Sequence, residues 1–296
     1  MQSLNDYAAV LDTSQNGEDG IIQEILRRLA EHVPLDGWCS EFGAWDGVYL
    51  SNTCHLIRNK NYRAVLIEGD PRRVARLRKN FPQSRVIKIQ RLVSFEGADA
   101  LDGIFAECEI PKNFDFLSID VDGVDYFIFE SLKIYRPKFV CVEFNFSIPN
   151  AVDWVQPRDM KVQQGASARA LVRLAAEKGY SLVASTKCNL FFVDDALIRY
   201  VIDAPARLEE LNPAGEDPTY LFVGYDGQLL SNQARVPLWW HGVWFRPSEI
   251  QYLPRPLRKP REAYSRIEEI CFSLLMFWRQ PWRLRKRVEA WLRRSD

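Results

Sequence analysis

Short apolar runs alternate with longer amphipathic segments through the middle of the chain. Five of the runs are rich in Val, Ile and Phe and bounded by Gly, Asp, Pro or Asn, which is typical of buried strands. They are WCSEFGA (38–44), RAVLIEGD (63–70), RVIKIQRLV (85–93), FDFLSIDVDG (114–123) and KFVCVEFN (138–145). The segments between them are long enough for crossover helices. This alternation predicts an α/β fold with a Rossmann-like, doubly wound and mostly parallel sheet.

The pattern continues at both ends of this core. SARALVRLAAEKGY (167–180) predicts a helix that Gly179 stops, followed by a final pair of strands at SLVAST (181–186) and NLFFVDD (189–195). Before the first strand, GEDGIIQEILRRLAEHV (17–33) places apolar residues on one helical face. We therefore expect this helix to pack against the sheet.

The last hundred residues carry weaker signals. The aromatic cluster LWWHGVWF (238–245) lies among turn residues, PRPLRKP (254–260) resembles a linker, and 261–294 predicts one or two helices interrupted at Pro281. The predicted parts are a helical lid or cap (1–37), the α/β core (38–195), an aromatic-rich extension that is a candidate acceptor-binding region (196–253), and a basic amphipathic helical tail (254–296).

Charge is distributed unevenly, although the formal net charge of the whole chain is zero. Residues 255–296 contain twelve Lys and Arg against five Asp and Glu, a net of about +7, which leaves about −7 on the preceding part. Because the core is acidic, we expect no nucleic-acid partner. The tail fits either peripheral attachment to an anionic membrane or packing on the core or on a second subunit, as in an oligomer.

Cysteine usage and the apolar runs bear on the compartment. The six cysteines form no CxxC pair, so we expect reduced thiols and no structural zinc. The first twenty residues lack the features of a signal peptide, and the longest uncharged apolar run, ICFSLLMFW (270–278), is too short to span a bilayer. We therefore expect a cytoplasmic protein, at the inner face of the membrane if the tail binds lipid.

The stretch EFGAWDG follows the first predicted strand, where open α/β sheets bind cofactors. A dinucleotide loop needs glycine where this chain has Trp45, and Asp46 adds negative charge where phosphates would lie. Glu41 and Asp46 would instead complement the ammonium and sulfonium charges of S-adenosylmethionine (SAM), while Gly43 and Gly47 keep the turn tight.

Glu68 ends the second predicted strand, a position from which a carboxylate accepts hydrogen bonds from ribose hydroxyls. The competing interpretation is that Gly43 and Gly47 are ordinary turn glycines and Glu68 is a solvated strand end.

Several motifs together resemble those of FkbM-type methyltransferases, class I SAM-dependent enzymes of a branch found with genes for bacterial surface polysaccharides. The motifs are SQNGEDGII, EFGAWDGVYLSNT, LIEGDP, FLSIDVDGVDYFIFESL and VCVEFN. The resemblance covers about residues 14–195. It implies a seven-stranded sheet, SAM as methyl donor, and an O-methyltransferase that acts on a hydroxyl, often of a sugar, in polysaccharide biosynthesis.

The resemblance also suggests that Ser14, Gln15, Glu18 and Asp19 form a polar lid over the cofactor. An ordinary helix N-cap with acidic first-turn residues is the alternative. The residues expected to bind SAM are Gln15, Glu18, Asp19, Glu41, Gly43, Ala44, Trp45, Asp46, Gly47, Asn52, Glu68, Gly69, Ser94 and Asp120.

Methyl transfer requires alignment of an acceptor and removal of its proton. The fourth and fifth predicted strands should bring Asp120, Asp122, Asp125, Glu143 and Asn145 to one rim. Asp120 is assigned to orienting SAM or the acceptor, Asp122 to the general base, and Glu143 and Asn145 to acceptor or metal. Alternatively, Asp120, Asp122 and Glu143 hold Mg²⁺ or another divalent cation, or Asp122 and Asp125 merely cap a helix.

His241, in the aromatic cluster, is expected to be a packed core residue or, if that segment covers the rim, an alternative base. Three functions remain open. They are an O-methyltransferase of a sugar, glycan or lipid-linked glycan, a methyltransferase of a lipid or small natural product, and a non-catalytic scaffold of the same fold in a polysaccharide-assembly complex. The acidic residues of the expected cofactor loop and rim count against the scaffold.

Overall fold

The computed structural model describes residues 1–211, 219–238, 241–280 and 282. The chain forms two compact units, Met1–Pro218 and Thr219–Asp296. Residues 196–211 therefore belong to the same unit as the predicted core, where Val201 and Leu208 are buried.

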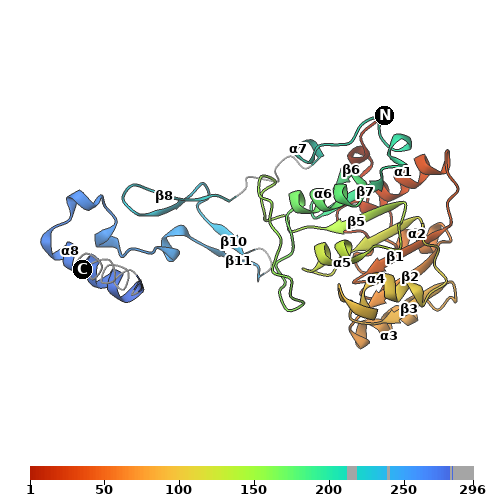
Figure 1. Ribbon diagram of the computed structural model, residues 1–296, viewed down its shortest axis with the longest axis horizontal. Helices are drawn as coiled ribbons and strands as arrows, with labels where there is room; N and C mark the ends of the chain where they lie inside the picture. Colours follow the sequence, from red (N-terminus) through yellow and green to blue (C-terminus); the bar gives the residue numbers. More distant parts are fainter. Residues whose placement is uncertain (212–218, 239–240, 281, 283–296) are drawn as a thin grey trace, which may run out of the picture. The chain divides into compact units, whose positions relative to one another are not determined.

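A seven-stranded sheet runs through the first unit in the order β3-β2-β1-β4-β5-β7-β6 (Figure 1). The strands are β1 (Trp38–Phe42), β2 (Arg63–Glu68), β3 (Val86–Gln90), β4 (Phe116–Ile119), β5 (Phe139–Glu143), β6 (Tyr180–Ser185) and β7 (Asn189–Asp194). The strand pairs are parallel except that β7 runs antiparallel to both β5 and β6. The predicted mostly parallel, seven-stranded, doubly wound sheet is confirmed.

Helices cover both faces of this sheet, and two of them, α3 and α6, begin at a residue whose side chain caps the helix. Asp70 accepts hydrogen bonds from the amides of Arg72 and Arg73, and Ser167 accepts one from Ala170. The helices are α1 (Glu18–Ala30), α2 (Cys54–Asn59), α3 (Pro71–Asn80), α4 (Leu101–Ala106), α5 (Asp125–Ser131), α6 (Ala168–Glu177) and α7 (Leu208–Leu211), with 3₁₀ turns at Leu4–Tyr7, Gly97–Asp99 and Ile198–Tyr200.

Two apolar clusters fill the space between the sheet and its helices. One contains residues of α1, α2 and α3 against one face of the sheet, and the other contains residues of α4, α5 and α6 against the opposite face. Ile21, Ile25 and Leu29 of α1 are fully buried. The predicted packing of this helix against the sheet is confirmed, and α1 belongs to the core of the first unit.

The second unit consists of two short hairpins and a helix. The strands are β8 (Leu221–Val223), β9 (Leu229–Ser231), β10 (Val236–Leu238) and β11 (Val243–Phe245), followed by 3₁₀ turns at Pro247–Ile250, Arg255–Leu257 and Arg261–Ala263 and by α8 (Arg266–Arg279). The predicted linker 254–260 thus contains a helical turn, with Leu257 buried. The predicted tail helix is α8, and Pro281 and 283–296 lie outside the described residues.

Apolar side chains of α8 are exposed. Ile267, Ile270, Leu274, Phe277 and Trp278 are more than half accessible and recur at helical spacing. Within the described part of the chain, no helix combines the length and the apolar character needed to span a membrane. Attachment of the tail to a membrane surface and oligomerisation through it stay predictions.

Candidate functional site

The carboxyl ends of β1, β2, β4 and β5 lie at one edge of the sheet because these strands run parallel. Asp120 follows β4 directly, and Glu143 is the last residue of β5. Asp120, Asp122 and Glu143 each place a carboxylate oxygen within 4.8 Å of the other two. The structure therefore brings together three of the four acidic residues that the sequence assigned to the rim.

Asp120 and Glu143 form a hydrogen-bonded carboxyl pair. Burial and the neighbouring Asp120 carboxylate raise the pKa of Glu143 far above its usual range. Burial also raises the pKa of Asp120, although the hydrogen bond from Glu143 opposes that rise. These directions place the proton on Glu143, which donates it to Asp120. Glu143 is therefore poorly suited to act as a base, and Asp120 is the member of the pair that ionises first.

Two further aspartates follow β4, and their surroundings differ. Buried Asp125 accepts hydrogen bonds from the amides of Val121 (2.8 Å) and Gly123 (2.9 Å). Asp122 is exposed and adopts a φ of 56°, a conformation that costs free energy in a non-glycine residue and is concentrated at functional sites. The N-cap of α5 is Val124 without a side-chain cap, so the expectation that Asp122 and Asp125 cap this helix is wrong.

The turn after β1 lies directly against the end of β4. Gly43 has a φ of 64°, and a Cβ added to it would lie 1.9 Å from the Asp120 carbonyl oxygen. Ala44 donates its amide to the carbonyl of Ile67 in β2 (3.1 Å). An added Cβ at Gly47 would meet Leu77 at 2.6 Å. Gly43 and Gly47 are thus glycines because of backbone conformation and close approach.

Glu68 and Trp45 join the ends of β1 and β2. The Glu68 carboxylate accepts hydrogen bonds from the amides of Trp45 (3.0 Å) and Asp70 (2.8 Å). The guanidinium of Arg73 lies 3.3 Å from the centre of a Trp45 ring, a cation–π contact. Glu68 is buried, so the alternative of a solvated strand end is wrong.

Glu41 and Asp46 are engaged with their own loop. Glu41 accepts hydrogen bonds from the hydroxyls of Ser51 (2.6 Å) and Thr53 (2.7 Å) and from the amide of Asn52 (2.7 Å). Burial raises the pKa of Glu41 to about 7. Asp46 accepts hydrogen bonds from the amides of Val48 and Tyr49. A direct contact of either carboxylate with SAM stays a prediction.

Asn52 and Gly69 lie near the ends of β4 and β3, respectively. The Asn52 side-chain amide donates to the Ser118 hydroxyl of β4 (3.0 Å), which ties the loop to the sheet. An added Cβ at Gly69 would lie 3.2 Å from Leu92. Ser94 follows β3, and its hydroxyl accepts a hydrogen bond from the amide of Glu96.

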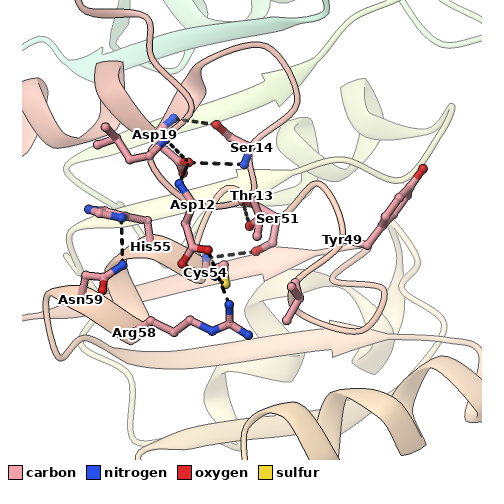
Figure 2. Close-up of polar contacts among 12 residues, drawn as sticks. Asp12, Thr13, Ser14, Asp19, Tyr49, Ser51, Cys54, His55, Arg58 and Asn59 are labelled. Atoms are coloured by element: carbon pink, nitrogen blue, oxygen red, sulfur yellow. Dashed lines mark hydrogen bonds and ion pairs between the residues drawn. The ribbon is translucent and has the colours of Figure 1, made fainter.

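The segment before α1 is folded over the loop that follows β1, as Figure 2 shows. Asp19 accepts hydrogen bonds on Oδ2 from the amides of Leu11, Asp12 and Ser14, at 3.0–3.3 Å. Thr13 donates its hydroxyl to the carbonyl of Ser51 (3.2 Å). The segment is therefore fastened both to α1 and to the loop that holds Glu41.

Glu18 and Gln15 face the turn between β6 and β7. Glu18 is fully buried and accepts a hydrogen bond from the Thr186 hydroxyl (2.6 Å). Gln15 is exposed, and its amide oxygen lies 3.7 Å from the Cys188 sulfur. The N-cap of α1 is Gly17, without a side-chain cap, so the expected side-chain N-cap is wrong. The predicted lid over SAM stays a prediction.

Asn145 and His241 lie in different surroundings. Asn145 donates its side-chain amide to the carbonyl of Gln164 (2.8 Å) and accepts hydrogen bonds from Ser147, so it organises the chain that follows β5. His241 belongs to the second unit, and its side chain is exposed. The expectation of a packed core histidine is wrong, and its role as a base stays a prediction.

Sequence reasoning missed Asn189, the first residue of β7. It pairs in register with Glu143, so it lies at the rim. Its Nδ2 donates to Glu18 (3.2 Å), whereas its Oδ1 is buried and accepts no hydrogen bond from the described residues. Asp19 Oδ1 is buried and unpartnered in the same sense. Nothing in NLFFVDD distinguishes Asn189 from any strand end, so no sequence signal could have identified it.

The residues at this edge fit a cationic nucleoside ligand. No ion pair among the described residues involves Glu41, Asp120 or Glu143, and each of the three has a raised pKa. A positively charged ligand would supply the missing charge partner, and the unpartnered oxygens of Asp19 and Asn189 offer acceptors for N–H donors. Phosphates would be repelled by the same carboxylates.

Comparison with known proteins finds no matching family model. No curated protein matches the chain either. Similar solved structures include the glycopeptide N-methyltransferase MtfA with S-adenosylhomocysteine, at 13% identity over 64% of this chain and 93% of that one, with a TM-score of 0.36. A TehB-like SAM-dependent methyltransferase from Corynebacterium glutamicum has 8% identity over 58% of this chain and 87% of that one, with a TM-score of 0.36.

A third similar structure is a SAM-dependent methyltransferase from Aquifex aeolicus. It has 13% identity over 59% of this chain and 92% of that one, with a TM-score of 0.32. The three structural neighbours named here are thus SAM-dependent methyltransferases. At these identities, the function of the chain has to be argued from its own residues.

The contact between Gly43 and β4 leads to a stability prediction. We expect Gly43→Ala to lower the free energy of unfolding by about 3 kcal/mol, because a methyl group would both collide with the Asp120 carbonyl and strain the backbone. Gly37→Ala is the matched control, since Gly37 has a similar φ of 67° and open space where the methyl group would lie. That variant should lose only about 1 kcal/mol. Urea unfolding measures both, and equal losses would contradict the collision.

Proposed function

We propose that this chain is a SAM-dependent O-methyltransferase that methylates a hydroxyl group of a sugar or glycan, in the biosynthesis of a bacterial surface polysaccharide. The observation that carries the proposal is a group of three carboxyl groups at the edge of the sheet beside the Gly43 turn. Glu41 is buried, Asp120 and Glu143 are half-buried, and none of the three forms an ion pair with the described residues. The acceptor class and the polysaccharide context rest on the motifs that resemble FkbM-type enzymes.

The charges of SAM match this set. SAM carries a sulfonium and an ammonium group, and Glu41 and Asp120 are carboxyl groups whose pKa burial has raised. A bound cation favours the ionised form of such groups and lowers their pKa again. Asp120 and the unpartnered oxygen of Asp19 are the acceptors we assign to the ammonium group. Glu68, at the end of β2, is assigned to the ribose hydroxyls.

Asp122 is assigned to proton removal. SAM, when bound, supplies an electrophilic methyl group, and a hydroxyl oxygen attacks it well only as it loses its proton. Asp122 is exposed and, unlike Asp125, none of the hydrogen bonds described above engages its carboxylate. It can therefore accept the proton of an acceptor hydroxyl that approaches the rim, while Asp120 remains bonded to Glu143.

The first experiment is calorimetric titration of SAM and S-adenosylhomocysteine into the purified chain, with NAD as a control ligand. We expect micromolar binding of SAM that tightens about tenfold between pH 6 and pH 7.5, because binding of a cation must displace protons from carboxyl groups such as Glu41, whose pKa is about 7. Heats measured in two buffers of different ionisation enthalpy should report proton release. Affinity that is constant or falls over this range would contradict the proposed charge pairing.

Glu68→Ala tests the same binding mode from the ribose side. The variant should bind SAM at least tenfold more weakly, because it removes both the proposed ribose contact and the bond to the Trp45 amide. Glu109→Ala is the control, since Glu109 is an exposed glutamate that makes only a loose ion pair with Arg63, at 3.7 Å. Absence of SAM binding by the unaltered chain would favour the non-catalytic scaffold.

Asp122→Asn tests the base. We expect kcat to fall about 100-fold or more, because proton transfer by a positioned carboxylate contributes on this scale, with the Kd of SAM changed less than about twofold. Asp195→Asn is the control, since Asp195 is exposed and follows β7 at the opposite edge of the sheet. Normal turnover by the Asp122 variant would remove the base assignment.

A divalent cation is the alternative route to hydroxyl activation. Asp120, Asp122 and Glu143 could hold Mg²⁺ through one oxygen each, and such an ion would supply Lewis-acid activation of a hydroxyl. If Asp122 acts as the base, activity after treatment with EDTA should equal that of the untreated chain. Loss of activity on chelation, with recovery on addition of Mg²⁺, would instead support the metal route.

A further inference from the structure

A segment of 24 residues, 144–167, connects β5 to α6 and lies within the described part of the chain. Loops of this length in compact domains are usually functional or disordered. Hydrogen bonds order this one from within. The side chain of Gln156, which is buried, donates to the carbonyl of Val162 (2.6 Å) and accepts from the amides of Gln164 and Gly165 (2.8 Å each).

The segment is fastened along the carboxyl edge of the sheet. At its β5 end, Asn145 bonds to the carbonyl of Gln164. Near its middle, Arg158 pairs with Glu130 of α5, and its guanidinium lies 3.5 Å from Glu96 and 4.7 Å from the centre of the Phe95 ring. The segment therefore extends from β5 past α5 to the residues that follow β3.

Gln163 meets the turn that carries the proposed base. A Cβ added to Gly123 would lie 3.0 Å from the Cα of Gln163 and 3.3 Å from the carbonyl oxygen of Val162. Gly123 is the residue immediately after Asp122. The backbone of Gln163 thus lies against the same turn, and its exposed side chain projects from this contact.

The exposed residues at this contact, Gln163 and Gln164, carry neutral amides, and the exposed charged residues of the segment, such as Asp159 and Lys161, lie at other positions along it. Gln163 and Gln164 are both exposed, and their side-chain amides make no hydrogen bond or ion pair with the described residues. A primary amide offers two donors and an acceptor, which matches adjacent hydroxyl groups. An anionic acceptor would be repelled by exposed Asp122 and by the Asp120 carboxylate. The two amides and the acidic rim together favour an uncharged acceptor with several hydroxyl groups.

We propose that segment 144–167 is the acceptor-recognition element of the enzyme and that Gln163 selects an uncharged, polyhydroxylated acceptor beside Asp122. This inference rests on the proposed methyltransferase activity. The placement of the segment assigns Gln163 to acceptor binding and an uncharged, polyhydroxylated chemistry to the acceptor. Gln163 holds a hydroxyl adjacent to the one that is methylated, so the reacting oxygen faces Asp122.

The test uses the full chain at saturating SAM. The acceptors are a panel of methyl glycosides of neutral hexoses and deoxyhexoses, and the rate of S-adenosylhomocysteine production is measured. Gln163→Ala should raise the KM for the best glycoside about tenfold, the effect of losing hydrogen bonds to substrate. The kcat should change less than about threefold, and the Kd of SAM from calorimetry should be unchanged. Gln163→Asn should restore part of the lost affinity, because it keeps the amide.

Gln83→Ala is the matched control. Gln83 is an exposed glutamine that precedes β3 at the amino edge of the sheet, so its loss should leave the KM for the glycoside unchanged. Melting temperatures of all variants show whether folding is intact, and removal of an exposed side chain should leave them equal.

The outcomes separate this inference from the proposed function. An unchanged KM in Gln163→Ala, with activity intact, overturns the assignment of Gln163 and leaves the methyltransferase standing. A chain that binds SAM but methylates no glycoside in the panel overturns the acceptor chemistry. A chain that binds no SAM overturns the proposed function, and this inference with it.

Discussion

Parallel strands end at a common edge of a sheet, and in this chain that geometry brings together carboxyl groups that form no ion pair within the described part of the chain. Asp120 follows β4, Glu143 ends β5, and Glu41 lies in β1 between β2 and β4. Their burial raises each pKa. A hydrogen bond between the two carboxyl groups holds Asp120 and Glu143 together. Hydroxyls and a backbone amide of residues 51–53 hold Glu41.

This arrangement is unfavourable for the protein alone and favourable with a suitable ligand. Buried carboxyl groups with raised pKa values weaken the folded state as pH rises through those values, because the unfolded chain ionises more readily. A positively charged ligand that binds the folded chain stabilises the ionised carboxyl groups. Its binding therefore increases the free energy of unfolding. The Gly43 turn approaches the Asp120 carbonyl more closely than a side chain would allow, so it lies directly beside the acidic groups.

The second unit buries few of its apolar side chains, Val236 and Leu257 among the described residues. Its hairpins are short, and much of the apolar surface of α8 is exposed. The acceptor-binding role of 196–253 stays a prediction. Segment 144–167, which follows β5 without a recognisable motif, contacts the turn that carries Asp122 through Gly123. Motifs in the sequence do not identify this segment, because the role we propose for it depends on its position beside Asp122 and not on a sequence pattern.

The sequence by itself determined where the strands and crossover helices lie along the chain and which face of α1 packs on the sheet, because these follow from the local hydrophobic period. It also determined that Asp120, Asp122 and Glu143 converge, because neighbouring parallel strands end at the same edge of a sheet. Only the tertiary structure decided how each carboxylate is used. Glu41 holds the 51–53 turn, Asp125 holds the turn after β4, and Asp122 stays exposed. Asn189 reaches the rim through an antiparallel strand far along the chain. Hydrogen-bond partners and burial arise between segments distant in sequence, so no local pattern encodes them.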